Sequence, residues 1–273
     1  MLDAAPVDTA PAPPPPTQFA SSEPDVLPRL IQPDIEAPEP DTAPAAQPVA
    51  DTRPPIEAFA ADFAPSGDAP RFGLILLDTE DAPALDLTGL TLPVAVALDP
   101  LLPDATERMA NLRAAGLEVL VLTPLVEGAT ASDVEVAFQS FFASVSQAVA
   151  VMDVPDAVLQ GDRQRAEQVV EILKATGHGL LTYDKGLNAI LQVAETDAVP
   201  ALKVTQVFDT GDSDAARMKR FLDQGAFRSG RDGQAVMVGY LRAETLETLS
   251  DWAQGNRAAS VQMAPVSAIL LQK

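Results

Sequence analysis

The sequence contains no cysteine and a single histidine, His178, in 273 residues. The absence of cysteine excludes disulfide bonds, thiolate nucleophiles and cysteine-ligated zinc or iron–sulfur sites. His178 lies between a predicted helix end and the start of a predicted strand. In a fold of alternating strands and helices this is the face opposite to the chemistry, because functional groups gather at the carboxyl ends of the strands. We therefore expect His178 to be a solvated or capping side chain and not a metal ligand.

Basic residues are also scarce. The chain has 18 lysines and arginines against 39 aspartates and glutamates, which gives a formal net charge of -21. Such a field repels phosphates, so neither nucleic acid nor an anionic membrane surface is an expected partner. No apolar run approaches the roughly 18 residues of a membrane span. Met1 is followed by Leu2 and Asp3 and not by the basic and apolar regions of a signal peptide, so we expect no direct membrane insertion by this chain.

Residues 1–70 differ in composition from the rest of the chain. They contain 17 of the 25 prolines, and twelve acidic residues against two basic ones. Proline removes backbone donors, and a segment with few large apolar residues cannot offset its ordering entropy by burial. We predict a disordered acidic stalk or linker that folding does not require. The patch at 56–63 is an exception, because Phe59 and Phe63 are spaced to form one or two helical turns that dock on the domain.

Residues 71–273 alternate short apolar runs with amphipathic helical patterns. Several runs are apolar throughout, as expected of strands buried on both faces. Repeated strand-then-helix units imply a parallel sheet, and seven or eight such units predict an α/β fold, a distorted or incompletely closed (β/α)7-8 barrel. A doubly wound open sheet is the alternative. The expected strands are 72–77, 93–98, 117–122, 148–152, 179–183, 203–208, 235–240 and 267–271.

Helix boundaries are readable at several positions. The pairs Asp104/Glu107 and Ser132/Glu135 have the spacing of a capping box, which predicts helix starts. Gly116 and Gly177 fall where a helix ends and the next strand begins, which favours a left-handed residue after each helix.

Several segments, in the same order and over almost all of 71–273, resemble the divergent polysaccharide deacetylases. That family is related to the metal-dependent enzymes that remove N-acetyl groups from peptidoglycan and chitin-like sugars. The resemblance implies a barrel of the polysaccharide deacetylase type and a place in carbohydrate metabolism. The matching segments are 92–100, 114–120, 147–151, 235–239, 244–246 and 265–270.

The family's metal-binding positions are occupied by other residues. Its first strand ends in Asp-Asp, and here Asp78 is followed by Thr79. Its His-Leu-Pro-Met and Asn-His-Met-Gly-Ser motifs correspond to residues 122–125 (Leu-Thr-Pro-Leu) and 153–157 (Asp-Val-Pro-Asp-Ala). Its late Gly-His-Pro-His motif corresponds to residues 239–242 (Gly-Tyr-Leu-Arg). Since a catalytic zinc needs about three good protein ligands, the resemblance implies a non-catalytic relative that holds no metal.

Acidic residues nevertheless follow most of the expected strands, and strand ends meet at one face of such a barrel. We predict a concave binding cleft there, with Arg242 as the counter-charge, and Asp78 is the catalytic candidate if the protein is an enzyme. Carboxylates could alternatively hold a divalent cation, or serve only as turn and helix caps. Glu127 also follows a strand. The residues of the predicted cleft are Asp78, Asp99, Asp153, Asp184, Asp209, Tyr240 and Arg242.

The resemblance implies a protein of the bacterial cell envelope or periplasm, and we expect it to act there as a glycan-binding or scaffolding module. Expected partners are a polysaccharide, peptidoglycan or an envelope protein. The stalk is of the kind that spaces a domain from an anchor, and we expect that anchor before Met1. Two alternatives stay open: an active deacetylase with carboxylate ligands, and a protein-interaction domain with no glycan role.

Overall fold

A computed structural model describes most of the chain from residue 52 onward. The described residues are 52–79, 85, 87, 90, 92–126, 128–156, 158–186, 188–210 and 213–272. The compact unit that contains them spans Ala50–Lys273. The predicted stalk lies outside the described residues up to residue 51, whereas 52–70 belong to the domain, so the folded part begins upstream of the boundary expected at residue 71.

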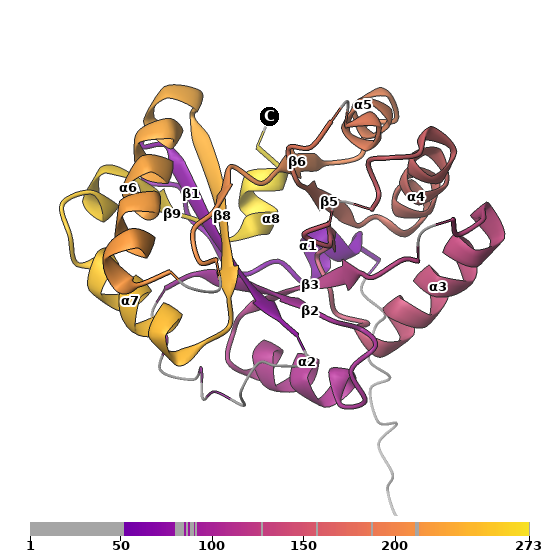
Figure 1. Cartoon of the computed structure of the whole chain (residues 1–273), viewed down its shortest axis with the longest axis horizontal. Helices are drawn as coiled ribbons and strands as arrows, with labels where there is room; N and C mark the ends of the chain where they lie inside the picture. Colours follow the sequence, from indigo (N-terminus) through magenta and orange to yellow (C-terminus); the bar gives the residue numbers. More distant parts are fainter. Residues whose placement is uncertain are drawn as a thin grey trace, which may run out of the picture. The chain divides into compact units, whose positions relative to one another are not determined.

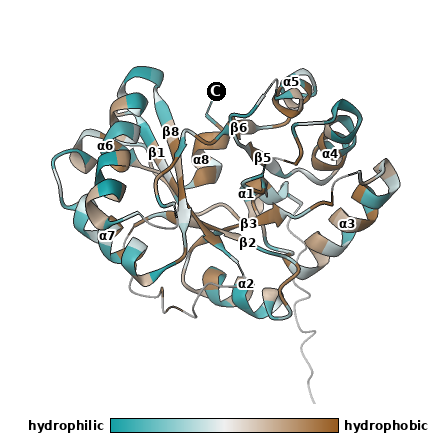
Figure 2. Ribbon diagram, viewed as in Figure 1, coloured by the Kyte–Doolittle hydropathy of each residue, from teal (hydrophilic) through white to brown (hydrophobic). Residues whose placement is uncertain are grey.

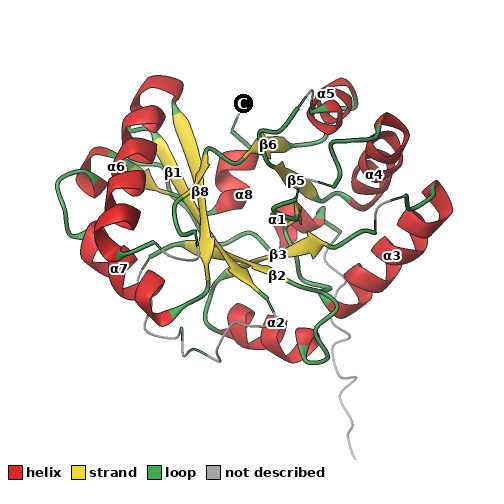
Figure 3. Cartoon of the chain, in the orientation of Figure 1, coloured by secondary structure: helices red, strands yellow, loops and turns green. Residues whose placement is uncertain are grey.

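One parallel sheet forms the centre of the domain (Figures 1 and 3). Its strand order is β6-β5-β4-β3-β2-β1-β8-β7, and β9 pairs with β1. This nearly sequential order, in a curled sheet with helices outside, confirms the barrel-like α/β prediction over a doubly wound sheet. The strands are β1 (Arg71–Asp78), β2 (Val94–Leu98), β3 (Glu118–Thr123), β4 (Ala150–Asp153), β5 (Gly179–Thr182), β6 (Ala201–Lys203), β7 (Gln206–Val207), β8 (Gln234–Tyr240) and β9 (Gln262–Met263).

The strand expected at 203–208 is split between the two ends of the curled sheet. β6 pairs with β5, and β7 pairs with β8. Between them, the Val204 amide donates to the Thr182 carbonyl (2.8 Å) and the Thr205 amide donates to the Val236 carbonyl (2.8 Å). The bent stretch from β6 to β7, residues 201–207, therefore bridges the two ends of the sheet, and we call this stretch the seam.

Except for the last one, the helices that follow the strands cover the outside of the sheet, with their apolar sides toward it (Figure 2). The expected left-handed glycines are confirmed, with φ of 78° at both Gly116 and Gly177. The capping box of α3 is formed by Thr130 and Asp133, two residues before the pair expected from the sequence. The helices are α1 (Pro55–Ala58), α2 (Ala105–Ala114), α3 (Ala131–Ser144), α4 (Arg163–Thr176), α5 (Ala189–Thr196), α6 (Ala215–Asp232), α7 (Ala243–Ala253) and α8 (Val266–Leu270).

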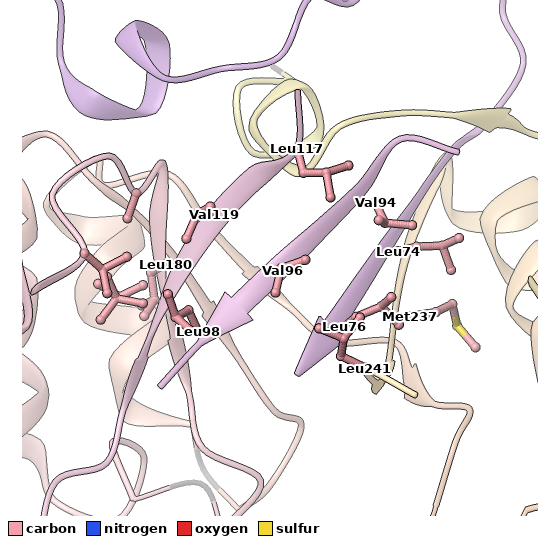
Figure 4. Close-up of a cluster of buried hydrophobic side chains, with 14 of the residues drawn as sticks. Leu74, Leu76, Val94, Val96, Leu98, Leu117, Val119, Leu180, Met237 and Leu241 are labelled. Carbon is pink, nitrogen blue, oxygen red and sulfur yellow. The ribbon is translucent and has the colours of Figure 1, made fainter. Parts of the chain in front are cut away.

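Two apolar clusters lie on the two faces of the sheet. On β1, Leu74 and Leu76 belong to the outer cluster between sheet and helices (Figure 4), and Ile75 and Leu77 belong to the inner cluster. The alternation follows from the two-residue period of a strand, and it explains why whole strands read as apolar. The C-terminal segment 267–271 was expected as a strand, but residues 266–270 form helix α8, which contributes to the inner cluster and fills the space inside the curled sheet.

The segment before β1 packs across the amino ends of the strands. Ile56 of α1 is buried in the inner cluster, as the apolar patch at 56–63 suggested. The buried Glu118 carboxylate, at the start of β3, accepts hydrogen bonds from the Ala61 amide (3.0 Å) and from the Ser267 amide (3.0 Å). It also accepts one from the Ser267 hydroxyl. One side chain therefore joins three segments that are far apart in sequence.

His178 lies on this same face, as expected, but it is buried and not solvated. Its ring stacks on Phe142, with 4.2 Å between ring centroids, and Nδ1 lies 2.9 Å from the Thr176 hydroxyl. Burial lowers the pKa of His178 to about 4, so the ring is a neutral part of the packing. Within the described part of the chain, no helix combines the length and apolarity that crossing a membrane requires.

Candidate functional site

The carboxyl end of β1 carries Asp78, the first residue of the predicted cleft. Asp78 has the parity of Leu74 and Leu76, so it faces the helix layer and not the barrel interior. Arg108 of α2 donates from Nη1 to Asp78 Oδ1 (2.8 Å) and from Nε to Asp104 Oδ2 (2.9 Å). Burial raises the pKa of Asp78, and the charge of Arg108 opposes that rise. Asp78 is thus a paired carboxylate.

Asp99 lies next to this pair but serves its own loop. Its amide donates to the Asp78 carbonyl (3.1 Å), and its carboxylate accepts from the Leu101 amide (2.9 Å). This is the turn-capping role that the sequence left open as an alternative. A cavity of about 210 Å³ adjoins the pair and is lined by Asp78, Arg108 and Leu241 among others.

A second group surrounds Tyr183 at the carboxyl ends of β4, β5 and β8. Asp153 is fully buried, and its carboxylate accepts from the Leu159 amide (3.4 Å) and the Thr182 hydroxyl (3.4 Å). Burial raises the pKa of Asp153 to about 6. Burial also raises the pKa of Tyr183, and the nearby Tyr240 and Asp153 raise it further. The buried Tyr183 hydroxyl has no hydrogen-bond partner within the described part of the chain.

Asp209 and Arg242 continue this group. The buried Asp209 carboxylate accepts from the Thr245 hydroxyl (2.6 Å) and the Tyr240 amide (3.3 Å). Arg242 Nη1 lies 3.7 Å from Asp209 Oδ1, and its guanidinium carbon lies 4.8 Å from the centroid of the Tyr240 ring. Arg242 is therefore a counter-charge of Asp209, and it covers the aromatic face expected to meet a sugar.

Asp184 belongs to neither group. Its exposed carboxylate pairs with Lys203 at 3.0 Å beside the seam. Glu127 lies outside the described residues.

The structure replaces the single cleft predicted from the sequence with these separate contacts. Asp78 and Asp99 lie near Arg108, Asp153 and Tyr240 lie near Tyr183, and Asp209 and Arg242 pair beside Tyr240. Inside the barrel, the strand ends present Leu77, Leu122, Met152, Tyr183 and Tyr240. The cause is strand parity, since a residue at a strand end faces inward or outward according to its register. Among the described residues, no three histidines or carboxylates are grouped so that they could hold a metal ion.

Sequence reasoning missed two residues that organise these groups. Arg108 was recognisable from its i,i+4 spacing after Asp104, the arrangement of a helical ion pair. Tyr183 directly precedes Asp184 at the end of a predicted strand, so the reasoning that selected Asp184 also applied to it.

A model of the family described as divergent polysaccharide deacetylase matches residues 79–270. The chain belongs to the divergent polysaccharide deacetylase family. The resemblance found in the sequence is confirmed, and the match covers the barrel from the end of β1 onward. No curated protein sequence is similar enough to the chain to count as a match.

Solved structures share the fold at low sequence identity. An uncharacterized protein from Agrobacterium tumefaciens C58 is 18% identical with a TM-score of 0.71, over 81% of this chain and 96% of that one. A putative cellobiose-phosphate cleavage protein from Enterococcus faecalis V583 is 12% identical with a TM-score of 0.56, over 74% and 99%. A lactam utilization protein from Thermus thermophilus is 14% identical with a TM-score of 0.52, over 71% and 99%. These likenesses show the barrel-like fold alone.

Proposed function

We propose that this protein is a non-catalytic member of the divergent polysaccharide deacetylase family. It acts in the bacterial cell envelope or periplasm as a glycan-binding or scaffolding module. The observation that carries the proposal is the ion pair between Asp78 and Arg108. Asp78 is the acidic residue retained at the family's metal-binding positions, and a carboxylate already neutralised by a guanidinium is a poor metal ligand.

The other corresponding positions support the same conclusion. Leu122 is buried in the inner cluster and offers no donor atom to a metal ion. Tyr240 replaces the first histidine of the late motif, and its ring lies under Arg242. Without a metal-bound hydroxide, a deacetylase lacks its nucleophile at neutral pH. The envelope location rests on the family and on the proline-rich acidic composition of residues 1–70.

The test is metal analysis of the purified full chain, with acetate release measured on acetylated chitooligosaccharides and peptidoglycan in the presence of added divalent ions. We expect no stoichiometric zinc, nickel or cobalt and no acetate release. The variants are Asp78→Asn and, as a matched control that removes the other carboxylate of Arg108, Asp104→Asn.

Metal-dependent acetate release that Asp78→Asn abolishes and Asp104→Asn spares would establish the enzymatic alternative. Glycan binding is measured on the same preparations by calorimetry with peptidoglycan fragments and chitooligosaccharides. If no glycan binds and the protein instead forms a defined complex with an envelope protein, the protein-interaction alternative replaces the proposal.

A further inference from the structure

A polar cleft of about 460 Å³ opens at the seam, between the bent β6–β7 stretch and the last turns of α6. It exists because β6 pairs with β5 and not with β8, which leaves the start of β8 without a neighbour on that side. Its charged and amide side chains are Asp184, Lys203, Arg228, Arg231, Asp232 and Gln234.

The cations of this cleft are held by the framework. Arg228 Nη1 donates to the Thr205 carbonyl (3.2 Å), which belongs to the seam itself. Arg231 lies three residues further along α6, so it shares the helix face of Arg228, and it forms a two-point ion pair with Asp232 (2.7 and 3.0 Å). Lys203 pairs with Asp184. Three cations against two carboxylates leave one positive charge in excess.

This local excess contrasts with a chain of net charge -21. The positive potential in the cleft affects Asp232. The hydrogen bond from Arg231, together with the charges of Arg231, Arg228 and Lys203, holds the pKa of the Asp232 carboxyl below its usual range. Oriented guanidinium groups match the planar, two-oxygen geometry of a carboxylate. The surrounding negative field disfavours ligands with many charges, such as nucleic acid.

Two further features favour a sugar as the carrier of that carboxylate. Phe227 precedes Arg228 on α6 and lies one helical turn before Arg231, outside the residues that line the cleft, and it is 70% exposed. An exposed aromatic ring one helical turn from a cleft residue can stack on the apolar face of a sugar ring. Gln234 lines the cleft wall, and a side-chain amide can pair with sugar hydroxyls as donor or acceptor.

We propose that the seam cleft binds a carboxylate-bearing glycan, with the carboxylate on Arg228, which pairs with no carboxylate among the described residues, and a sugar ring against Phe227. The inference rests on the proposed glycan-binding function and deepens it by naming the site and the ligand class. Such a carboxylate occurs on the lactyl group of muramic acid and on uronic acids, and the cleft chemistry is common to both.

The experiment is calorimetric titration of the full chain with three ligands. These are the peptide-free disaccharide of N-acetylglucosamine and N-acetylmuramic acid, tetragalacturonate, and neutral triacetylchitotriose. At least one acidic ligand should bind, and the neutral one should bind at least about tenfold more weakly, which corresponds to about 1.4 kcal/mol. The stronger acidic ligand identifies the source of the carboxylate.

The variants locate the binding. Arg228→Gln and Phe227→Ala should each weaken the acidic ligand about tenfold or more, and Arg228→Lys should retain part of the affinity. Arg220→Gln is the matched control, because Arg220 is an exposed arginine of the same helix outside the cleft lining. Unchanged melting temperatures show that the variants are folded.

Three results would overturn the inference. Acidic ligands that bind equally to wild type and Arg228→Gln would place the glycan elsewhere and leave the proposed function intact. Tighter binding of the neutral ligand than of both acidic ligands would also contradict a carboxylate site in the cleft and leave the proposed function intact. If neither the three ligands nor peptidoglycan fragments bind, both the proposed role of the cleft and the proposed glycan-binding function are wrong.

Discussion

Replacing Glu118 with alanine tests how the segment before β1 is held to the barrel. The buried carboxylate accepts hydrogen bonds from the Ala61 amide, the Ser267 amide and the Ser267 hydroxyl. Alanine leaves these donors without the carboxylate, in a site where Glu118 and Ser267 are buried and Ala61 is partly buried. Ala61 belongs to the segment before β1, and Ser267 belongs to α8, so the substitution weakens both attachments at once.

The magnitude follows from the three contacts. A hydrogen bond to a charged group contributes about 1.5–3 kcal/mol to stability. The variant also avoids the free-energy cost of burying a carboxylate, and this gain offsets part of the loss of the three hydrogen bonds. We expect the free energy of unfolding to fall by about 4 kcal/mol. For a domain of this size, that corresponds to a melting temperature lower by roughly 10 °C.

Urea unfolding of the full chain measures the change, with Glu135→Ala as the control, because Glu135 is an exposed glutamate of α3. The control should stay within about 0.5 kcal/mol of wild type. The contacts also predict non-additivity. A chain that begins at residue 71 lacks Ile56 and Ala61, so Glu118→Ala should cost less in that background than in the full chain.

Removal of residues 1–51 alone should leave the melting temperature unchanged within a few degrees, because a proline-rich acidic segment with few large apolar residues cannot offset its ordering entropy by burial. A loss below about 1 kcal/mol for Glu118→Ala in the full chain would refute the reasoning, as would equal losses in the two backgrounds.

Two further predictions concern conformation and pH. Gly177→Ala should destabilise the fold more than Gly116→Ala, as melting temperatures will show, because both have φ of 78° but only at Gly177 would a Cβ meet Pro54, at 2.6 Å; equal losses would contradict this. The pKa of His178, lowered from 6.5 to about 4, gives stability that is present above pH 6.5 and lost as the pH falls through 4. The pKa of Asp153, raised from 3.8 to about 6, gives stability that is present below pH 3.8 and lost as the pH rises through 6. The two contributions oppose each other between pH 6.5 and 4. Asp153→Asn should therefore make the loss of stability on acidification steeper over this range. Urea unfolding midpoints that depend on pH as they do in the wild type would contradict this prediction.

Most of the sheet was predictable, because strands buried on both faces are continuous apolar runs and need no knowledge of their neighbours. Six of the eight expected runs became single strands for this reason, whereas the run 203–208 is split between the partly exposed β6 and β7. The eighth, at 267–271, failed because a short apolar run has the same composition in a buried helix, and α8 fills the barrel interior. The two-residue strands β7 and β9 lack any periodic signal, since they are defined only by their partners.

The class of fold, the family resemblance, the excess of negative charge and the acidic residues at strand ends could all be predicted from the amino-acid sequence. These are local properties of composition, order and spacing. The directions of the acidic side chains depend on the folded chain, because a shift of one residue in strand register exchanges the barrel interior for the helix layer. The folded chain also determines which partners neutralise Asp78 and Asp209, since Arg108 and Arg242 reach them across 30 and 33 residues of chain. The seam cleft likewise depends on the closure of the sheet, which brings α6 against a strand that the sequence presents as continuous.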